Sequence, residues 1–346
     1  MFSRLSSALA ALAALAGPFL ALASPVVPRN LASRQETKWN FTDYAYFYFR
    51  GERRPNGEQV HIAVSNNNDP GSWTTLNNGN PILISNVGYK GIRDPVLIPN
   101  HDRSKYWVIS TDLKVYDYGW NSGFCFTCQG THQIVIWESE DLINWTGPTH
   151  PIVSPDNAGM TWAPDAIWHP EKKAYQVFWT SKLDGNSALH IMRSFTTDFK
   201  NFTIGERYVD RGMDATIAHD DSTGNYYFIS KNGPGNGIEH NVANSLEGPW
   251  RKISDRIGLS KMQAGEGPLI FKNNVNPNKW HLWIDAYLDG GRYIPFETDD
   301  VESGQWMPSQ GYGLPADPRH GSVVPITAAE REALMTLSEN MIAGKK

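Results

Sequence analysis

The stretch QIVIWESEDLINW, residues 133–145, consists of a short apolar strand, a polar turn and a closing tryptophan. The same order of features returns without gaps in HIAVSNNNDPGSW (61–73), HIMRSFTTDFKNF (190–202), IEHNVANSLEGPW (238–250) and IPFETDDVESGQW (294–306). The closing aromatic residues stand roughly 50 to 70 residues apart, which is the length that one four-stranded sheet per repeat requires. Five such repeats predict an all-β chain folded as a five-bladed β-propeller.

A second series of segments falls between these windows, and each begins with an ionisable residue that leads into an apolar strand. The five leading residues, or heads, are Asp94, Asp165, Asp214, Glu266 and His320. A proline stands five residues after three of the heads, at Pro99, Pro170 and Pro325, and supports this alignment. We interpret the segments as the innermost strands of the blades and expect the heads at equivalent positions around the propeller axis.

The strand headed by His320 has no strands after it, because the chain soon ends in a helical pattern opened by a Thr327–Glu330 capping box. Two N-terminal segments, 42–50 and 59–65, have no inner strand of their own. We therefore expect them to complete the blade that begins at His320, so that no open edge remains between the first and last blades. Residues 38–346 are then a single propeller domain with a short C-terminal helix.

The N-terminus has the features of a signal peptide. Residues 1–23 contain a charged Arg4, an apolar run and a small-residue cleavage site, Ala21-Leu22-Ala23. Residues 24–37 are polar and proline-bearing and are interpreted as a leader or disordered lead-in. We expect a secreted, extracellular protein.

Two further features agree with secretion. Three sequons, at Asn40, Asn144 and Asn201, fit a glycosylating pathway. The chain has two cysteines, Cys125 and Cys128. Their spacing in a secreted chain favours a small-loop disulfide over redox chemistry, and two thiolates alone cannot close a zinc site.

Net charge and composition limit the classes of molecule that the protein is expected to bind. The formal net charge is −5, so no basic surface favours nucleic acid or an anionic membrane. Aromatic residues make up 12% of the chain. Such rings suit the C–H faces of sugars, although most of them also serve core packing. We expect a monomer that acts on a polysaccharide or oligosaccharide.

Four of the five heads are acids, and carboxylates gathered in one channel repel each other unless a function retains them. Turn formation or binding of a structural cation explains a single acid better than four in register. Cleavage of a glycosidic bond needs one protonated carboxyl and one ionised carboxylate. Neighbouring like charges separate the two pKa values as this chemistry requires.

Over residues 40–327 the motifs resemble those of glycoside hydrolase family 43, five-bladed propellers that include α-L-arabinofuranosidases, β-xylosidases and arabinanases. The matching motifs are Arg93-Asp94-Pro95, Trp162-Ala163-Pro164-Asp165, Asp214 before an apolar strand, Gly265-Glu266-Gly267-Pro268 and Arg319-His320-Gly321-Ser322. The resemblance implies Asp94 as general base, Glu266 as general acid and Asp214 as the group that raises the pKa of this acid and orients it. It also implies inversion, with the base and acid carboxyls on the order of 6.5–9.5 Å apart.

The resemblance further implies a substrate-binding set. Its members are Trp162, Asp165, Arg319 and His320. Trp162 is expected either as a pocket wall or as a packing residue, and Asp165 in a structural or pocket-polarity role. In some relatives the histidine corresponding to His320 lies near a central cation such as Ca²⁺, but no cofactor is required. The chain departs from the family in having Ala215 after Asp214, where proline is frequent.

The expected function is therefore exo-acting release of α-L-arabinofuranose from hemicellulose or pectin side chains, with the loop 116–129 shaping one rim of the pocket. β-Xylosidase and endo-arabinanase activities of the same family are the alternatives. A non-catalytic carbohydrate-binding propeller would not need the acid pair. The segment 68–71 is similar to the Asn-Asp-Pro-Asn-Gly signature of fructan- and sucrose-cleaving propellers, but it falls in the turn of the first window.

Overall fold

The computed structural model describes residues 39–345 apart from 186–187 and 232–236. The predictions for the signal peptide, 1–23, and the lead-in, 24–37, concern residues outside this part of the chain. No helix within the described residues is long and apolar enough to cross a membrane.

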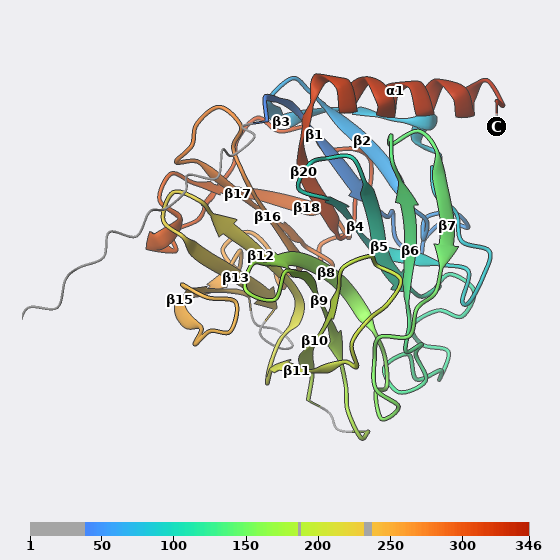
Figure 1. Cartoon of the computed structure of the whole chain (residues 1–346), viewed down its shortest axis with the longest axis vertical. Helices are drawn as coiled ribbons and strands as arrows, with labels where there is room; N and C mark the ends of the chain where they lie inside the picture. Colours follow the sequence, from blue (N-terminus) through green and yellow to red (C-terminus); the bar gives the residue numbers. More distant parts are fainter. Residues whose placement is uncertain (1–38, 186–187, 232–236, 346) are drawn as a thin grey trace, which may run out of the picture. The chain divides into compact units, whose positions relative to one another are not determined.

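Five antiparallel four-stranded sheets form the molecule (Figure 1). The first four sheets, each given from its inner strand outward, follow the chain. They are β4 (Ile92–Pro99), β5 (Tyr106–Asp112), β6 (Ile134–Ser139) and β7 (Trp145–Thr149); β8 (Trp162–His169), β9 (Ala174–Ser181), β10 (His190–Thr196) and β11 (Glu206–Val209); β12 (Met213–Asp220), β13 (Asn225–Lys231), β14 (Ile238–Ala243) and β15 (Arg251–Ile257); β16 (Glu266–Lys272), β17 (Trp280–Asp285), β18 (Tyr293–Thr298) and β19 (Met307–Pro308).

The fifth sheet joins the two ends of the described chain. Its order is β20 (Gly321–Thr327), β1 (Phe41–Tyr48), β2 (His61–Asn66) and β3 (Asp69–Thr75). The pairing of Tyr48 with Gly321 and of Phe41 with Thr327 fixes the register of β1 against β20. The inner strands β4, β8, β12, β16 and β20 contact one another in ring order, and β20 contacts β4. The predicted five-bladed propeller, closed by N-terminal strands, is confirmed.

The repeated windows mark the outer half of each blade. Each window begins at or next to the third strand and ends on an aromatic residue in the fourth strand or just before it. The first window contains the segment 68–71, which was predicted as a turn; Asn68 lies in the turn after β2, whereas 69–71 begin β3. Of two short 3₁₀ turns, Asn77–Gly79 follows the outer strand β3, and Val301–Ser303 connects β18 to the outer strand β19.

Aromatic side chains fill the spaces between blades. Trp107 of β5 lies 4.5 Å, centroid to centroid, from Phe199, which follows β10 in the next blade. Tyr46 of β1 meets Trp283 of β17 edge to face at 5.5 Å. Such buried rings contribute large apolar areas. They keep the blades at fixed angles, so the strand heads at the axis are held rigidly.

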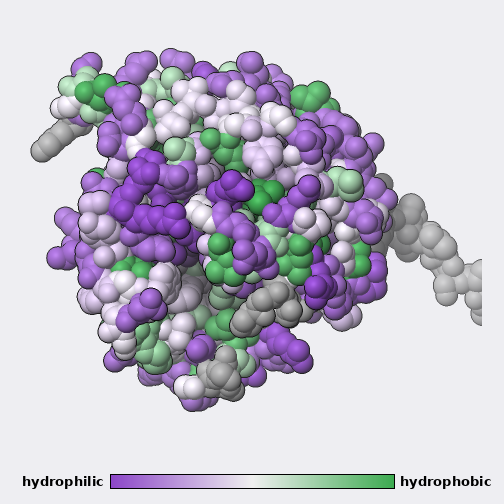
Figure 2. Space-filling model, turned by 180° about the vertical axis from the view of Figure 1, so that it is seen from behind, coloured by the Kyte–Doolittle hydropathy of each residue, from purple (hydrophilic) through white to green (hydrophobic). Residues whose placement is uncertain are grey.

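The C-terminal helix α1 (Ala328–Ile342) packs on the closing blade, where it contacts β1 and β20 (Figure 1). It begins with the predicted capping box: the Thr327 side chain accepts from the Glu330 backbone, and the Glu330 carboxylate accepts from Thr327 N. Elsewhere, the face shown in Figure 2 is mainly hydrophilic, with hydrophobic residues in small scattered groups.

Candidate active site

A β-bulge lies at the start of four of the inner strands and turns side chains toward the axis. At each bulge one residue has a left-handed backbone; these residues are Asp94 (φ 54°), Ala163 (φ 50°), Asp214 (φ 51°) and Gly267 (φ 50°). Non-glycine residues rarely adopt this conformation, and where they do it is frequently at functional sites. Gly267 is required for a second reason, because a Cβ atom there would lie 2.5 Å from His320 Cγ.

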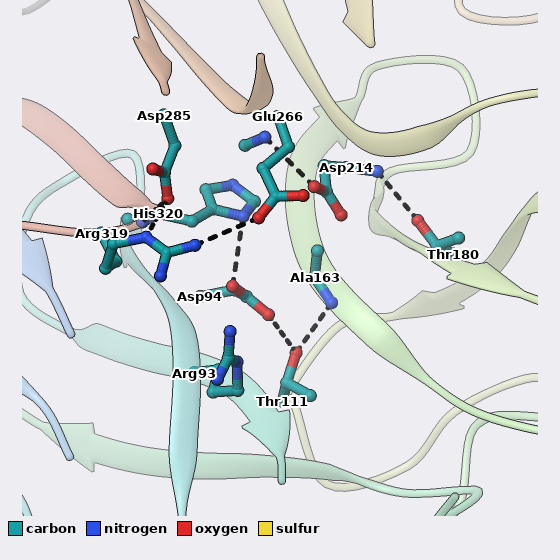
Figure 3. A network of polar contacts seen from close by, with 12 residues as sticks. Arg93, Asp94, Thr111, Ala163, Thr180, Asp214, Glu266, Asp285, Arg319 and His320 are labelled. Atoms are coloured by element: carbon teal, nitrogen blue, oxygen red, sulfur yellow. Dashed lines mark hydrogen bonds and ion pairs between the residues drawn. The ribbon is translucent and has the colours of Figure 1, made fainter. Parts of the chain in front are cut away.

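Asp94 is held as a carboxylate by its neighbours (Figure 3). Its Oδ2 atom accepts a hydrogen bond of 2.8 Å from Thr111 Oγ1, and its Oδ1 atom lies 3.2 Å from His320 Nδ1. Burial opposes ionisation of Asp94, but the hydrogen bond and charge of His320, with the charge of Arg93, lower its pKa. Asp94 is therefore ionised across the usual working range of pH.

Glu266, the first residue of β16, is in the opposite condition. Burial and the negative charge of Asp214 raise its pKa, while Lys231 and Arg319 oppose this rise. Arg319 Nη2 lies 3.2 Å from Oε1 of Glu266, and Lys231 Nζ lies 3.2 Å from Oε2. The pKa values of the Asp94 and Glu266 carboxyls are thus displaced in opposite directions.

Asp214 connects the two sides of the cluster. Its Oδ2 accepts a hydrogen bond of 3.1 Å from Gly267 N, and its own backbone N–H donates to Thr180 Oγ1 at 2.9 Å. Burial, with the charge of Asp94 acting in the same direction, raises the pKa of Asp214. Its position next to the residue that follows Glu266 lets it act on the proton of that acid.

Arg319 is oriented from behind by a buried carboxylate. Asp285, the last residue of β17, is fully buried and accepts a hydrogen bond of 2.6 Å from Arg319 Nε. Burial raises the pKa of Asp285 to about 6, although the Arg319 charge opposes the rise. Figure 3 shows Arg319 between Asp285 and Glu266, so one guanidinium spans both acids.

These groups open into a pocket of about 400 Å³. Its polar wall comprises Glu52, Arg93, Asp94, Asp214, Glu266 and Arg319. The remaining wall is mostly apolar and includes Trp120, Trp162, Tyr287 and Leu288. Polar groups that converge on a cavity with apolar and aromatic walls are typical of a small-ligand site. Trp162 thus lies in the pocket wall, the first of the two positions expected for it.

Two residues of the expected substrate-binding set lie elsewhere. Asp165 and His320 line a separate cavity of about 320 Å³, formed by residues further along the inner strands. Trp162 pairs with Thr180 as Arg93 pairs with Thr111, so Asp165 corresponds to Val96 and not to Asp94.

The prediction that all five heads are equivalent is therefore wrong. Asp165 lies two residues deeper in its strand than Asp94 does, and Glu266 occupies the position of Arg93, one residue earlier. Burial raises the pKa of Asp165 to about 6, and its hydrogen bond with Thr216 opposes the rise. His320 contacts Asp94, which lines the pocket.

His320, which was expected near a central cation, forms an ion pair with Asp94. Although burial opposes protonation, its hydrogen bond and ion pair with Asp94 raise its pKa to about 9. Within the described part of the chain, no group of three or more His, Cys, Asp and Glu side chains is placed to bind a metal ion.

One rim of the pocket comes from the loop after β5. Cys125 and Cys128 are joined by a disulfide there, and Trp120 of the same loop donates from Nε1 to Glu52 at 3.1 Å. Glu58, fully buried, accepts from Arg93 Nη1 at 2.8 Å and from two backbone N–H groups of the loop, those of Val115 and Tyr116. One carboxylate thus ties the loop to the pocket.

The three sequon asparagines are all exposed.

The sequence reasoning missed Lys231 and Asp285. Each residue ends the second strand of its blade, and in an antiparallel pair that end lies beside the start of the inner strand. Lys231 indeed pairs with Met213, and Asp285 pairs with Glu266. Ionisable residues at the ends of the second strands were a signal that could have identified both.

The fold and this pocket define a class: five-bladed propellers in which a carboxyl pair of opposite protonation tendency faces a sugar-sized cavity, as glycoside hydrolysis requires. Residues 40–332 match a family model described as "Probable glycosyl hydrolase domain", related to glycosyl hydrolase family 43. The chain belongs to glycoside hydrolase family 43.

One curated relative is the α-L-arabinofuranosidase of Bifidobacterium longum subsp. longum. It is 32% identical over 286 residues, which cover 75% of this chain and 25% of the relative. The chain therefore spans about a quarter of the length of that relative.

Solved structures share the fold. The exo-β-1,3-galactanase of Phanerochaete chrysosporium, solved with β-1,3-galactotriose, aligns with a TM-score of 0.53 over 78% of this chain and 60% of that one, at 15% identity. A family 43 β-1,3-galactosidase solved with galactodeoxynojirimycin aligns with a TM-score of 0.53 at 14% identity. The alignment covers 79% of this chain and 92% of that one. At such identities the likeness concerns the fold alone.

Proposed function

We propose that this glycoside hydrolase is an inverting, exo-acting α-L-arabinofuranosidase that removes side-chain arabinose from plant hemicellulose or pectin, arabinoxylan in particular. The observation that carries the hydrolytic chemistry is the opposite displacement of the Asp94 and Glu266 pKa values within one pocket. The choice of sugar is supported by the 32% identity to an α-L-arabinofuranosidase. The size of the pocket, about 400 Å³, supports exo action on a terminal sugar.

In the proposed reaction the ionised Asp94 accepts a proton from water as the water oxygen bonds to the anomeric carbon. The bond from that carbon to the leaving oxygen breaks, and Glu266 gives this oxygen its proton. Attack from the opposite face inverts the anomeric configuration. The proton on Asp94 then returns to Glu266 through solvent, and both groups are restored.

Lys231 and Arg319 have a defined place in this cycle. Their contacts with Glu266 Oε2 and Oε1 are those of a carboxylate, the form left after the proton is delivered. Asp214 favours the protonated form before the reaction, since its negative charge raises the Glu266 pKa. The balance keeps the acid able both to hold a proton and to lose it.

The test is a panel of nitrophenyl α-L-arabinofuranoside, nitrophenyl β-xyloside and nitrophenyl β-galactoside, together with arabinoxylan and arabinan. We expect release of arabinose alone from the polymers, with β-arabinose as the first anomer seen by NMR. Glu266→Gln and Asp94→Asn should each lower kcat by about 10²–10⁴-fold. Full activity in both variants, or release of internal oligomers only, would contradict the proposal.

We also propose that the protein is secreted, N-glycosylated, and active as a monomer. Exposure of Asn40, Asn144 and Asn201 supports glycosylation. Expression in a eukaryotic secretory host should give protein in the medium whose mass falls after glycosidase treatment. Protein retained in the cells and unglycosylated would contradict it.

A further inference from the structure

The turn that follows β1 carries three arginines next to the pocket. Arg50, Arg53 and Arg54 lie in a tight turn closed by the bonds Arg50 N–H to Gly57 O (2.7 Å) and Gly57 N–H to Arg54 O (3.1 Å). Together with Arg319 they line a cavity of about 120 Å³, which we call the arginine cavity. The acids around it are Glu52 and Asp317, so positive charge prevails locally in a chain whose net charge is −5.

The arginine cavity adjoins the active-site pocket. Glu52 and Arg319 line both of them, so a group bound in one lies beside a group bound in the other. The larger cavity accepts a sugar ring, whereas the smaller one accepts only the end of a substituent. A single branched substrate could therefore occupy both.

Glycines keep the arginine cavity open. Cβ atoms added at Gly51 and Gly291 would each lie within 3.4 Å of the Arg319 side chain, so both backbones pack directly on it. Beside them, Gly290 faces open space, with no atom within 4 Å of an added Cβ. On the side formed by Gly51, Gly290 and Gly291, the wall of the arginine cavity therefore has no side chain that could fill the cavity.

Guanidinium donors remain available there. Arg53 is exposed and makes no hydrogen bond or ion pair with any residue that the structure describes. Arg54 pairs with Asp317, but both side chains are about half exposed, at 49% and 51%. An ion pair this exposed contributes little and is easily exchanged. Nε of Arg50 is buried without a partner.

We propose that the arginine cavity is a subsite for the carboxylate of a uronic acid carried by the polysaccharide next to the sugar being cleaved. A guanidinium presents a planar fork that matches a carboxylate and gains nothing comparable from a neutral sugar hydroxyl. The inference rests on the proposed function for the identity of the cleaved sugar. The preference for a carboxylate depends only on the arginines.

The direct test is calorimetric titration of the full chain with methyl β-D-glucuronide and methyl α-D-galacturonide. Their matched controls are methyl β-D-glucoside and methyl α-D-galactoside. We expect at least one uronide to bind about tenfold more tightly than its neutral counterpart. The difference should shrink as NaCl is raised.

Three variants separate this subsite from general surface charge. Arg53→Gln/Arg54→Gln should abolish the preference for the uronide. Asp317→Asn should strengthen uronide binding, because it removes the carboxylate that competes for Arg50 and Arg54; asparagine tolerates the left-handed backbone of Asp317 (φ 52°). Arg207→Gln is the matched control, since Arg207 is also 49% exposed and paired with an aspartate, Asp210.

A second arm compares arabinose release from glucuronoarabinoxylan with release from the same polymer after chemical reduction of its carboxyl groups. We expect the wild type to favour the acidic polymer and the double variant to treat both alike. Equal binding of each uronide and its neutral control, or an unchanged preference in the double variant, would overturn the subsite. Failure to cleave nitrophenyl α-L-arabinofuranoside would instead refute the proposed function, and the titrations would still report on the arginines.

Discussion

His320 Nδ1 lies 3.2 Å from Asp94 Oδ1. This ion pair joins two neighbouring blades, because His320 directly precedes β20 and Asp94 lies near the start of β4. Burial opposes the charge on the ring, yet the Asp94 hydrogen bond and charge raise the His320 pKa to about 9. The imidazolium therefore persists at neutral pH. It holds Asp94 ionised without occupying the pocket in which substrate binds.

The pH dependence of kcat/KM should be bell-shaped. Asp94 must be ionised, so activity is lost as pH falls through its pKa, which lies below the ordinary value of 3.8. Glu266 must be protonated, so activity is lost as pH rises through its pKa, which lies above 4.5. Initial rates on nitrophenyl α-L-arabinofuranoside across the acidic and neutral range check both limbs. An acid limb well above pH 3.8 would contradict the assignment of Asp94.

Asp214→Asn should move the alkaline limb to lower pH, by about one unit, because it removes a negative charge that raises the Glu266 pKa. Asp220→Asn is the control: Asp220 lies in the same strand and is similarly buried (5% against 7% exposed), but pairs with Lys272. An unmoved limb in Asp214→Asn would show that this carboxylate does not act on the acid.

Lys231→Met should move the same limb in the opposite direction. Lys231 Nζ lies 3.2 Å from Glu266 Oε2, and its charge lowers the Glu266 pKa. Loss of this charge should raise the alkaline limb by about one pH unit. Lys272→Met, which breaks an ion pair away from the pocket, should leave the profile in place. A shift to lower pH in Lys231→Met would refute the proposed balance of charges.

Thr111→Val should lower kcat about tenfold and move the acid limb to higher pH, because a hydrogen bond to an ionised group is lost. Thr111 Oγ1 donates to Asp94 Oδ2 at 2.8 Å and accepts from Ala163 N at 2.7 Å. Thr298→Val, at a buried threonine of β18, controls for general destabilisation. The same loss of kcat in both variants would mean that Thr111 acts only through stability.

Glu330→Gln should lower the free energy of unfolding by about 3 kcal/mol, because one partner of a buried ion pair is removed. The Oε1 atom of Glu330 accepts a hydrogen bond of 2.6 Å from Arg103 Nε and one of 2.7 Å from Tyr106 Oη. The Glu330 carboxylate thereby joins α1 to the blade of β4 to β7. Urea unfolding followed by circular dichroism measures the change. The exposed Glu332 of the same helix supplies the control, Glu332→Gln, which should differ from wild type by less than about 0.5 kcal/mol.

Most of the architecture could be predicted from the sequence, because each blade repeats one order of strand, turn and aromatic residue. The window 133–145 and its counterparts have the short apolar strands and turn residues that specify a local hairpin. Closure by the N-terminal strands could be predicted by counting strands per blade, since no further strands follow the segment headed by His320. These features depend on local chemistry and on the rule that sheet edges are covered.

The register of the inner strands could not be predicted in the same way. Pro170 stands as far from Asp165 as Pro99 does from Asp94, yet bulges at both strand starts place Asp165 two residues deeper. A bulge inserts a residue without a sequence signature of its own when the left-handed position is filled by alanine, as at Ala163. The sequence also did not predict that Lys231 and Arg319 contact Glu266, because each of them comes from a different blade.

The last inner strand of the ring, β20, is also the last strand in the chain, and it is preceded directly by Arg319 and His320. During synthesis β1, β2 and β3 emerge before β20, so the inner edge of β1 stays unpaired until β20 has been made. The same event that seals this adhesive edge delivers both cations to the acids at the axis. Closure of the propeller and assembly of the acid cluster with its two cations are thereby a single step of folding.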